Sequence, residues 1–161
     1  MARVLIKKLN PNVELPIYKT SGASGMDLKA FIKEPIKITP NSSYLVPTGL
    51  SIAFSEDYEV QIRPRSGLAA KNNITVLNTP GTIDSDYRGE IKIIIFNHGK
   101  EDFVINNKDR VAQMILAPVV KMKFEEVDNL PDTLRGEGGF GSTGKWKANW
   151  IKKSLKDSQD K

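Results

Sequence analysis

Cysteine is absent from this chain, histidine occurs once, and no hydrophobic run is long enough to cross a membrane. The lack of cysteine excludes a disulfide framework, a thiolate nucleophile and a cysteine-based zinc site. The chain has no second His and no Cys to bind a metal ion together with His98, so we interpret His98 as a turn residue. A membrane span needs about 18 consecutive apolar residues, and the apolar stretch near the N-terminus is too short for a signal peptide. We therefore expect a soluble, cytoplasmic protein without a membrane partner.

Little of the positive charge belongs to the body of the chain. The net charge is +5, but residues 145–161 contain six Lys and two Asp and so carry +4 of it. A nucleic-acid-binding domain spreads its basic residues over one face. We therefore expect no stable nucleic-acid binding, and we assign the excess charge to a basic C-terminal tail.

Long helical patterns are also missing, because nine prolines interrupt the 161 residues and proline breaks helices. A chain of this length forms one domain with a sizeable core. Short runs rich in Val, Ile, Phe and Tyr, bounded by Pro and Gly, predict strands over residues 2–9, 27–32, 43–54, 58–65, 74–77, 90–97 and 110–120. Inside the body of the chain, only residues 66–71 favour a helical turn; in the tail, Trp146, Trp150, Ile151 and Leu155 fall near one helical face, which fits either an amphipathic helix or a frayed basic tail. The prediction is a compact, mainly antiparallel all-β domain.

A glycine-rich segment, RGEGGFGSTG, spans residues 135–144 and contains five glycines. Together with Lys145 it matches most of the spacing of a phosphate-binding P-loop. A P-loop, however, follows a buried strand, opens a helix and carries Ser or Thr after its lysine to hold Mg²⁺. Residues 132–135 have no strand pattern, and Trp146 follows the lysine. The segment is therefore not a P-loop.

Two interpretations of this segment stay open on its residues alone. Arg135, Ser142 and Thr143, with several backbone N–H groups, have the chemistry to wrap a triphosphate, and Phe140 has the ring to cover a planar base. The alternative is a disordered tail.

Two further segments place polar groups at strand ends. Asp27 stands at the entry to a predicted strand. Arg65, Ser66 and Gly67 stand where another predicted strand ends, before the helical turn, as in an anion-binding turn. The alternative for this second segment is a plain turn with a solvated arginine.

The segment NTPGTIDSDYRGE, residues 78–90, predicts a hairpin-like loop that leads into a strand beginning at Glu90. Asp84 and Tyr87 lie three residues apart, so a carboxylate and a ring could line one pocket. A carboxylate at that place can position and deprotonate a water. The alternative is an Asp that only shapes the turn. Any metal site would be rich in oxygen, which favours Mg²⁺ carried by a polyphosphate.

Five segments, taken in order, carry a family resemblance: SGASGMDLKA, PRSGLA, GTIDSDYRGE, DRVAQMI and RGEGGFGSTG. They resemble the five motifs of the trimeric dUTPases (deoxyuridine 5′-triphosphate nucleotidohydrolases) and together span residues 21–144. Two departures occur. The first motif carries an extra serine in its G-A-S-G run, and the tail after Gly144 is longer than the family needs.

The resemblance implies an all-β fold of a particular kind: a distorted jelly-roll-like β-barrel. It also implies a homotrimer with active sites shared between subunits, and a flexible C-terminal glycine-rich arm. The chain then divides into a β-barrel domain over residues 1–134, a lid motif over 135–144 and the basic tail over 145–161. The implied reaction is Mg²⁺-dependent hydrolysis of dUTP to dUMP and pyrophosphate, with water attacking the α-phosphate. This reaction limits uracil incorporation into DNA and supplies dUMP for dTMP synthesis.

The motifs also imply roles for individual residues. Asp84 would hold the attacking water, Tyr87 would stack on the sugar and exclude a 2′-OH, and Asp27 would orient neighbouring groups through water bound to Mg²⁺. The other implied substrate contacts are Asn78, Thr82, Ile83 and Lys92 for the uracil and sugar, Arg65, Ser66, Gly67 and Gln113 for the triphosphate, and Arg135, Phe140, Ser142 and Thr143 from the lid.

Three other classes of protein compete with this interpretation. A dCTP deaminase shares the fold and assembly, but it needs a glutamate to act on the cytosine ring, whereas this chain has Asp84 within IDSDY. The other two are a binding or regulatory protein that has lost turnover and a nucleic-acid binder that uses the basic tail. A chemically competent residue at every assigned position favours the hydrolase.

Overall fold

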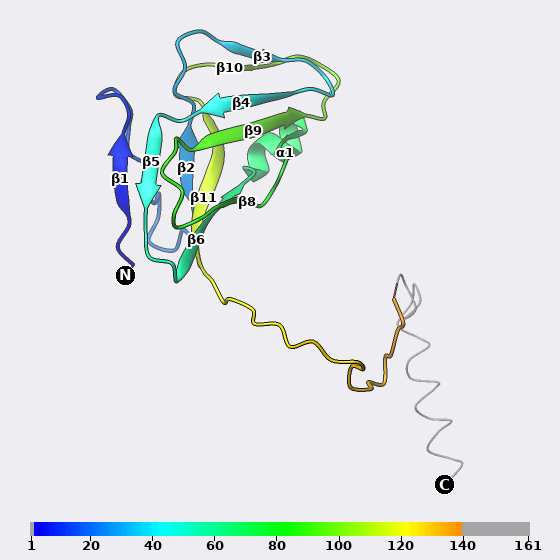
Figure 1. Cartoon of the computed structure of the whole chain (residues 1–161). Helices are drawn as coiled ribbons and strands as arrows, with labels where there is room; N and C mark the ends of the chain where they lie inside the picture. The colour runs from blue at the N-terminus through cyan, green and yellow to red at the C-terminus, as the bar shows by residue number, and fades with distance from the viewer. Residues whose placement is uncertain (1, 140–161) are drawn as a thin grey trace. The chain divides into compact units, whose positions relative to one another are not determined.

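The computed structural model describes residues 2–139. The chain divides into two units, Met1–Lys121 and Met122–Lys161. All the helices and strands among the described residues lie in the first unit (Figure 1), and residues 122–139 of the second contain neither. No helix between residues 2 and 139 is long and apolar enough to cross a membrane. The all-β prediction is confirmed.

The first unit contains eleven strands and one short helix, α1 (Ser66–Asn72). The strands are β1 (Leu5–Lys8), β2 (Met26–Lys29), β3 (Ile36–Ile38), β4 (Ser43–Pro47), β5 (Leu50–Ala53), β6 (Tyr58–Arg63), β7 (Ile74–Val76), β8 (Gly81–Ile83), β9 (Lys92–Asn97), β10 (Phe103–Ile105) and β11 (Arg110–Pro118). They pair in the orders β1-β5, β10-β3, β2-β11-β6-β8 and β4-β9-β7, always antiparallel. Among residues 2–139 these pairings do not close into a continuous barrel.

The core forms where alternate residues of these strands point to the same side. Successive side chains of a strand face opposite ways, so β9 buries Ile93, Ile95 and Asn97 while Lys92 stays exposed. Leu28 of β2 and Val46 of β4 are also fully buried. Because a half-buried strand needs only every second residue to be apolar, the short β-branched runs of this sequence are sufficient to build the core.

One predicted strand, over residues 43–54, is two strands in the structure. The break falls at Gly49, whose φ is +69° and whose ideal Cβ would lie 2.5 Å from Cγ2 of Val13. β4 pairs with β9, whereas β5 pairs with β1, so the break lets the chain change sheets. The prediction of one continuous strand is therefore wrong, because a left-handed glycine ends the extended run.

The predicted hairpin-like loop over residues 78–90 is also wrong. β8 pairs with β6, while β9 pairs with β4 and β7, so the two strands flanking the loop belong to different sheets. β9 begins at Lys92, because the backbone N–H of Ile91 instead donates to the carbonyl oxygen of Leu50 at 2.8 Å. The sequence analysis also missed β3, β8 and β10. Each has only three residues, so its alternating pattern is short; β7 has the same length but lies within the predicted strand over residues 74–77.

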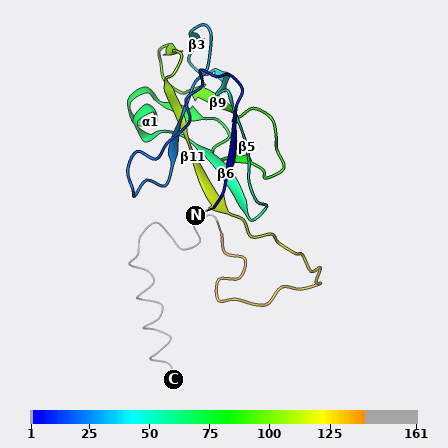
Figure 2. The same ribbon diagram turned by 90° about the vertical axis from the view of Figure 1, so that its left-hand side faces the viewer.

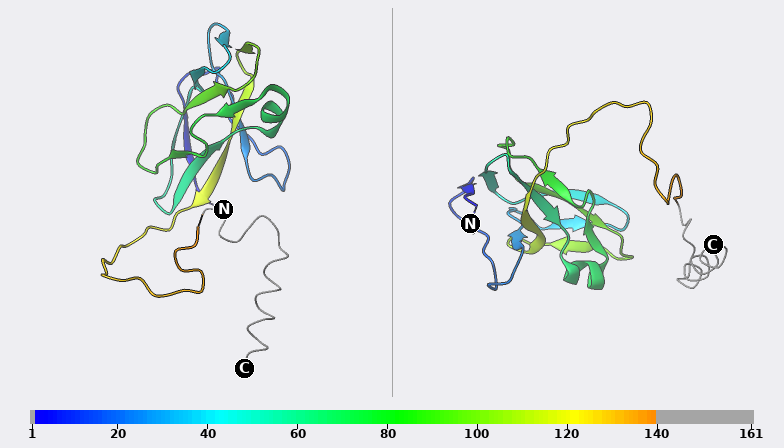
Figure 3. Two further views of the ribbon diagram at one scale, coloured as in Figure 1. Left: turned by 90° about the vertical axis from the view of Figure 1, so that its right-hand side faces the viewer. Right: turned by 90° about the horizontal axis from the view of Figure 1, so that it is seen from below.

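The helical turn predicted over residues 66–71 is confirmed by α1, which follows β6. In Figure 1, α1 and β1 lie on opposite sides of the first unit, and Figures 2 and 3 show the same unit from other directions. The loop that joins β8 to β9 runs on the side of β5 (Figure 1), where the hydrogen bond from Ile91 to Leu50 ties it to that strand. The segments that carry the candidate site residues are thus spread over the unit.

Candidate functional site

Asp27 and Arg65 come together where β2, β11 and the end of β6 meet. Nε of Arg65 donates to Oδ1 of Asp27 at 2.9 Å, and Nη1 of Arg65 donates to the carbonyl oxygen of Arg110 at 3.0 Å. Both side chains are largely buried, 23% and 20% exposed, which strengthens a charge-assisted pair. The guanidinium of Arg65 is therefore fixed in orientation, and residues 2–139 use two of its five N–H donors.

Arg110 also belongs to this cluster, although its motif gave it no role. Its Nη1 donates to Oδ2 of Asp27 at 3.0 Å, so the Asp27 carboxylate lies between two guanidiniums. Arg110 stands within the DRVAQMI segment, where only Gln113 received a role. The only sequence signal for this cluster was the presence of one aspartate and two arginines, each in a different motif. Their contact, however, depends on the pairing of β2 with β11.

Gln113 joins the same cluster through its backbone neighbours. It lies opposite Asp27 on one side and Arg63 on the other, and its Nε2 donates to the carbonyl oxygen of Pro64 at 3.0 Å. An ideal Cβ on Gly25 would lie 2.7 Å from Oε1 of Gln113, so the glycine leaves room for this side chain. The predicted phosphate contacts at the start of α1 and in β11 are thus brought to one place.

Ser66 and Gly67 form the first turn of α1, directly after Arg65. Leu68 and Ala69 donate their N–H groups to the carbonyl oxygen of Arg65, at 3.1 and 3.0 Å. Ser66 and Gly67 are exposed, and an ideal Cβ on Gly67 would meet no atom within 4 Å. No packing contact in the described part of this chain therefore requires glycine there, although glycine in a helix is less favourable than alanine by about 1 kcal/mol.

Asp84 and Tyr87 lie in the loop between β8 and β9. The N–H of Tyr87 donates to the carbonyl oxygen of Asp84 at 3.2 Å, which closes a turn, and Oη of Tyr87 donates to the carbonyl oxygen of Glu90 at 3.0 Å. Nη1 of Arg88 donates to the carbonyl oxygen of Ser85 at 2.6 Å. The Asp84 side chain is exposed and forms no hydrogen bond within residues 2–139. The loop therefore presents this carboxylate outward on a braced backbone.

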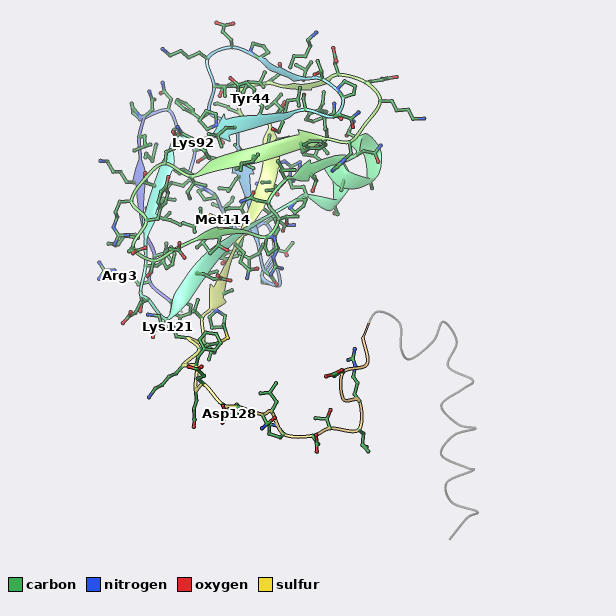
Figure 4. The ribbon with its side chains drawn as sticks, turned by 45° about the vertical axis from the view of Figure 1, so that its right-hand side comes forward. Arg3, Tyr44, Lys92, Met114, Lys121 and Asp128 are labelled. Carbon is green, nitrogen blue, oxygen red and sulfur yellow. The ribbon has the colours of Figure 1, made fainter. Side chains whose placement is uncertain are left out.

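The predicted uracil and sugar contacts flank this loop. Thr82 and Ile83 lie in β8, opposite Gln61 and Val60 of β6. Asn78 precedes β8, and its Nδ2 would lie 3.2 Å from an ideal Cβ on Gly81. Lys92 begins β9 with its side chain 46% exposed and its Nζ 3.8 Å from Oε2 of Glu90 (Figure 4).

The two groups of predicted site residues lie toward opposite ends of β6. Ile83, next to Asp84, faces Val60, whereas Arg65 follows β6 five positions later in the chain. An extended residue advances the chain by about 3.3 Å, so roughly 16 Å of strand separates the two positions. Within residues 2–139 of one chain, the predicted phosphate contacts lie together, and so do the predicted contacts of the loop. The two groups do not meet at one point.

The predicted lid residues belong to the second unit. Nε of Arg135 donates to the carbonyl oxygen of Gly138 at 2.7 Å, and the N–H of Gly138 donates to the carbonyl oxygen of Arg135 at 3.1 Å. Gly136 between them has a φ of +51°. Phe140, Ser142 and Thr143 lie outside the described residues.

A group of acidic side chains suited to enclose a metal ion is absent from residues 2–139. Asp27 is the predicted metal contact, and both of its carboxylate oxygens already accept from guanidiniums. An ionised carboxylate has about four lone-pair sites, so each oxygen still has room to accept from a metal-bound water. The residues thus fit a hydrated ion that arrives with a phosphate ligand, as Mg²⁺ commonly does.

Beside this cluster, Glu14 pairs with two lysines. Lys29 donates to Oε2 of Glu14, and Nζ of Lys108 lies 3.0 Å from Oε1. The hydrogen bonds from Lys29 and Lys108, and then their charges, lower the pKa of Glu14 to about 2. These three residues line a cavity of about 120 Å³ together with Asp27 and Arg110.

The described residues define an all-β protein in which the arginines of two motifs meet the aspartate of a third. The dUTPase family model matches residues 11–144. The chain belongs to the dUTPase family.

Curated relatives match over nearly the whole chain. The chain is 54% identical over 143 residues to the deoxyuridine 5′-triphosphate nucleotidohydrolase of Bdellovibrio bacteriovorus, covering 88% of this chain and 96% of that protein. It is also 54% identical to the proteins of that name from Nautilia profundicola, over 89% of this chain and 99% of that one, and from Rickettsia felis, over 89% and 98%.

Solved structures share the fold at lower identity. The dUTPase of Staphylococcus bacteriophage 80alpha with dUPNHPP has a TM-score of 0.79 and 22% identity, covering 88% of this chain and 98% of that one. A mutant dUTPase from phage phi11 of S. aureus, whose structure reveals the coordination of a structural Mg(II) ion, has a TM-score of 0.72 and 19% identity. The match covers 81% of this chain and 99% of that one. At these identities the likeness concerns the fold alone.

Proposed function

We propose that this chain is a dUTP diphosphatase that hydrolyses dUTP to dUMP and pyrophosphate. The observation that carries the proposal is 54% identity, across almost the full length of both chains, to proteins named deoxyuridine 5′-triphosphate nucleotidohydrolase. The cluster of Asp27, Arg65 and Gln113 supports it, because it provides directed donors for a highly charged anion. In the cell this reaction limits uracil incorporation into DNA and supplies dUMP for dTMP synthesis, and we expect a cytoplasmic location.

In the proposed mechanism, the Asp84 carboxylate positions a water and accepts its proton as the water oxygen attacks the α-phosphorus. A bond forms between that oxygen and phosphorus, and the bond from the α-phosphorus to the bridging oxygen breaks. The electron pair leaves with pyrophosphate, and Asp84 releases its proton to solvent. The outward position of this carboxylate on a braced turn supports the role, because a general base must reach a water held by the substrate.

Arg65, Ser66, Gly67 and Gln113 would hold the triphosphate. Arg65 is oriented for this by Asp27 and by the carbonyl of Arg110, and three of its N–H donors remain for phosphate oxygens. The empty space around Gly67 lets a phosphate approach the backbone N–H groups closely. Donors held in place around developing negative charge are expected to supply much of the acceleration.

The nucleoside would be recognised by the loop residues. Asn78, Thr82, Ile83 and Lys92 would line the uracil and sugar pocket, and Tyr87 would stack on the deoxyribose. A pocket built to pair with the uracil edge leaves polar groups unsatisfied with cytosine, which can discriminate by about 10⁴-fold or more. From the lid, Arg135, Ser142 and Thr143 would contact phosphate, and Phe140 would cover the uracil.

Mg²⁺ bound to the triphosphate would neutralise part of its charge and that of the departing pyrophosphate. Asp27 would contact it through water. Its two arginine neighbours support an indirect rather than a direct contact, because both carboxylate oxygens already accept hydrogen bonds.

The active site would be completed by other subunits of a homotrimer. The support is geometric: Asp84 and Arg65 must both act at the phosphates, yet roughly 16 Å of strand separates their positions in one chain. In the same assembly we propose the jelly-roll-like β-barrel over residues 1–134, a flexible lid over 135–144 that covers a neighbouring site, and the basic tail over 145–161.

The test is pyrophosphate release in the presence of Mg²⁺ with dUTP, dCTP, dTTP and UTP supplied separately. We expect pyrophosphate release from dUTP and at least about 10²-fold less from dCTP, dTTP and UTP. Each of these three nucleotides either lacks a group with which the proposed site pairs or carries an additional group that the site excludes. Ammonia release from dCTP would instead place the chain with the deaminases. Binding of dUTP without turnover would make it a nucleotide-binding protein.

A further inference from the structure

Gly89, a residue without an assigned role, occupies a place where any side chain would collide with Tyr87. An ideal Cβ on Gly89 would lie 2.2 Å from Oη of Tyr87, 2.4 Å from Cζ and 2.9 Å from Cε2. Real Cβ atoms essentially never approach another atom this closely. All three nearest atoms belong to one ring, so the space that glycine leaves is filled by Tyr87.

The backbone of residue 89 does not explain the glycine. The positive-φ glycines of the described residues are Gly49 and Gly136, so residue 89 adopts a conformation open to alanine. No backbone atom or core side chain is among the three nearest neighbours of its ideal Cβ. What the missing side chain provides here is room for the Tyr87 ring.

The Tyr87 ring is otherwise held only lightly. Its Oη donates to the carbonyl oxygen of Glu90 at 3.0 Å, and the side chain of Glu90 is itself fixed by the N–H of Gly49, which donates to Oε1 at 2.8 Å. Tyr87 is 44% exposed, so no packed core prevents the ring from swinging away. Within residues 2–139 its position therefore depends on one hydrogen bond and on the space that Gly89 leaves.

We propose that Gly89 is a positioning residue for sugar discrimination: by lacking a side chain it lets the Tyr87 ring lie against the loop where it blocks a 2′-OH. This inference rests on the proposed role of Tyr87. A methyl group at residue 89 pushes the ring outward, breaks the bond to Glu90 and leaves space for a ribose. Because the displaced atoms are the free end of an exposed side chain, the fold remains intact.

The experiment compares kcat/KM for dUTP, UTP and dCTP in the wild type and in Gly89→Ala, Tyr87→Ala and the double variant. Gly22→Ala is the matched control, because an ideal Cβ there meets nothing within 4 Å and Gly22 is exposed. We expect Gly89→Ala to lower the preference for dUTP over UTP by about 10–100-fold, the scale of losing one steric contact. The preference for dUTP over dCTP and the melting temperature should change little.

In the double variant, Gly89→Ala should add nothing to the effect of Tyr87→Ala, because the two residues act through the same ring. An additive effect, a parallel loss of uracil preference, or failure of Gly89→Ala to fold would each overturn the inference. The inference would also be overturned if Gly89→Ala kept the wild-type preference for dUTP over UTP while Tyr87→Ala lost that preference. If Tyr87→Ala itself keeps the sugar preference, the proposed role of Tyr87 is wrong, which is a separate outcome.

Discussion

At the scale of single atoms, each oxygen of the Asp27 carboxylate accepts from a different guanidinium. Such charge-assisted bonds are short and directional. They fix the plane of the carboxylate and, through Nε, the plane of Arg65. Local contacts also set the position of the Tyr87 ring: one hydrogen bond to the carbonyl oxygen of Glu90 and the space left because Gly89 has no side chain.

Asp84→Asn tests the proposed general base. The amide has nearly the same shape but cannot accept a proton, so we expect kcat to fall by at least about 10²-fold while dUTP still binds. Steady-state turnover with dUTP and isothermal titration with a non-hydrolysable analogue measure the two properties. Asp86→Asn, two residues away in the same loop, is the control. Turnover of Asp84→Asn within a factor of about three of the wild type would contradict the assignment.

Glu14→Gln tests the ion pairs beside the Asp27 cluster. The pKa of Glu14 is lowered from its ordinary 4.5 to about 2 by Lys29 and Lys108. A lowered pKa means that the pair stabilises the fold above pH 4.5 and loses this contribution as the pH falls towards 2. The lysine and glutamate side chains are 37–58% exposed, so the effect is small.

Urea unfolding of the wild type and Glu14→Gln at constant ionic strength, from pH 7 to pH 2, measures the effect. We expect the difference in the free energy of unfolding to be constant above about pH 5 and to shrink below it. Glu34→Gln is the control, because Glu34 is exposed and forms no ion pair within residues 2–139. A difference that does not vary with pH would show that the charge of Glu14 is not involved.

At the scale of elements, the ends of strands are where this fold depends on particular polar groups. Asn97, at the end of β9, is 1% exposed. Its Nδ2 donates to the carbonyl oxygens of Ile38 at 2.9 Å and Glu101 at 2.8 Å, and its Oδ1 accepts from the N–H of Gly99 at 2.8 Å. One side chain thus ties β9 to β3 and to the turn that follows.

Asn97→Leu removes three hydrogen bonds while keeping a similar volume. Because it leaves backbone groups without partners in a buried place, we expect the free energy of unfolding to fall by about 2–4 kcal/mol. Asn12→Leu is the matched control, since Asn12 is exposed and its side chain makes no hydrogen bond within residues 2–139. Its stability should stay within about 0.5 kcal/mol of the wild type. Equal effects of the two substitutions in urea unfolding would contradict the role given to Asn97.

At the scale of the whole molecule, the central question is how the proposed base, Asp84, and the proposed phosphate contact, Arg65, act on one substrate although they lie apart in one chain. The proposed homotrimer answers it by taking Asp84 and Arg65 of each site from different subunits. This arrangement can be tested by complementation. Neither Asp84→Asn nor Arg65→Ala alone should turn over dUTP at an appreciable rate.

When the two variants are co-refolded in equal amounts, a site with Asp84 from one chain and Arg65 from another is intact in about a quarter of the random combinations. We therefore expect about a quarter of the wild-type turnover. The separately refolded variants, mixed without exchange, are the control and should stay inactive. No recovery despite mixed trimers, detected by mass spectrometry, would mean that each chain supplies both residues of its own site.

Much of the fold class followed from local pattern. β-Branched runs between prolines and glycines predicted the all-β unit, and the helical turn predicted over residues 66–71, which begins inside the PRSGLA segment, matches α1. Three of the four strands of three residues, β3, β8 and β10, escaped prediction, because alternation is hard to recognise over so short a run; the fourth, β7, was predicted within residues 74–77. The break at Gly49 escaped too, since the apolar residues on both of its sides continue the same pattern.

The sequence by itself determined the family, because the five motifs are strings of particular residues in a particular order, as the match over residues 11–144 confirms. Only the tertiary structure decided which of those residues meet. It paired β8 with β6 instead of β9, brought Arg110 to Asp27, placed Tyr87 over Gly89 and separated Asp84 from Arg65. Sheet partners and register are set by contacts between segments distant in the chain, and no local pattern of residue types contains them.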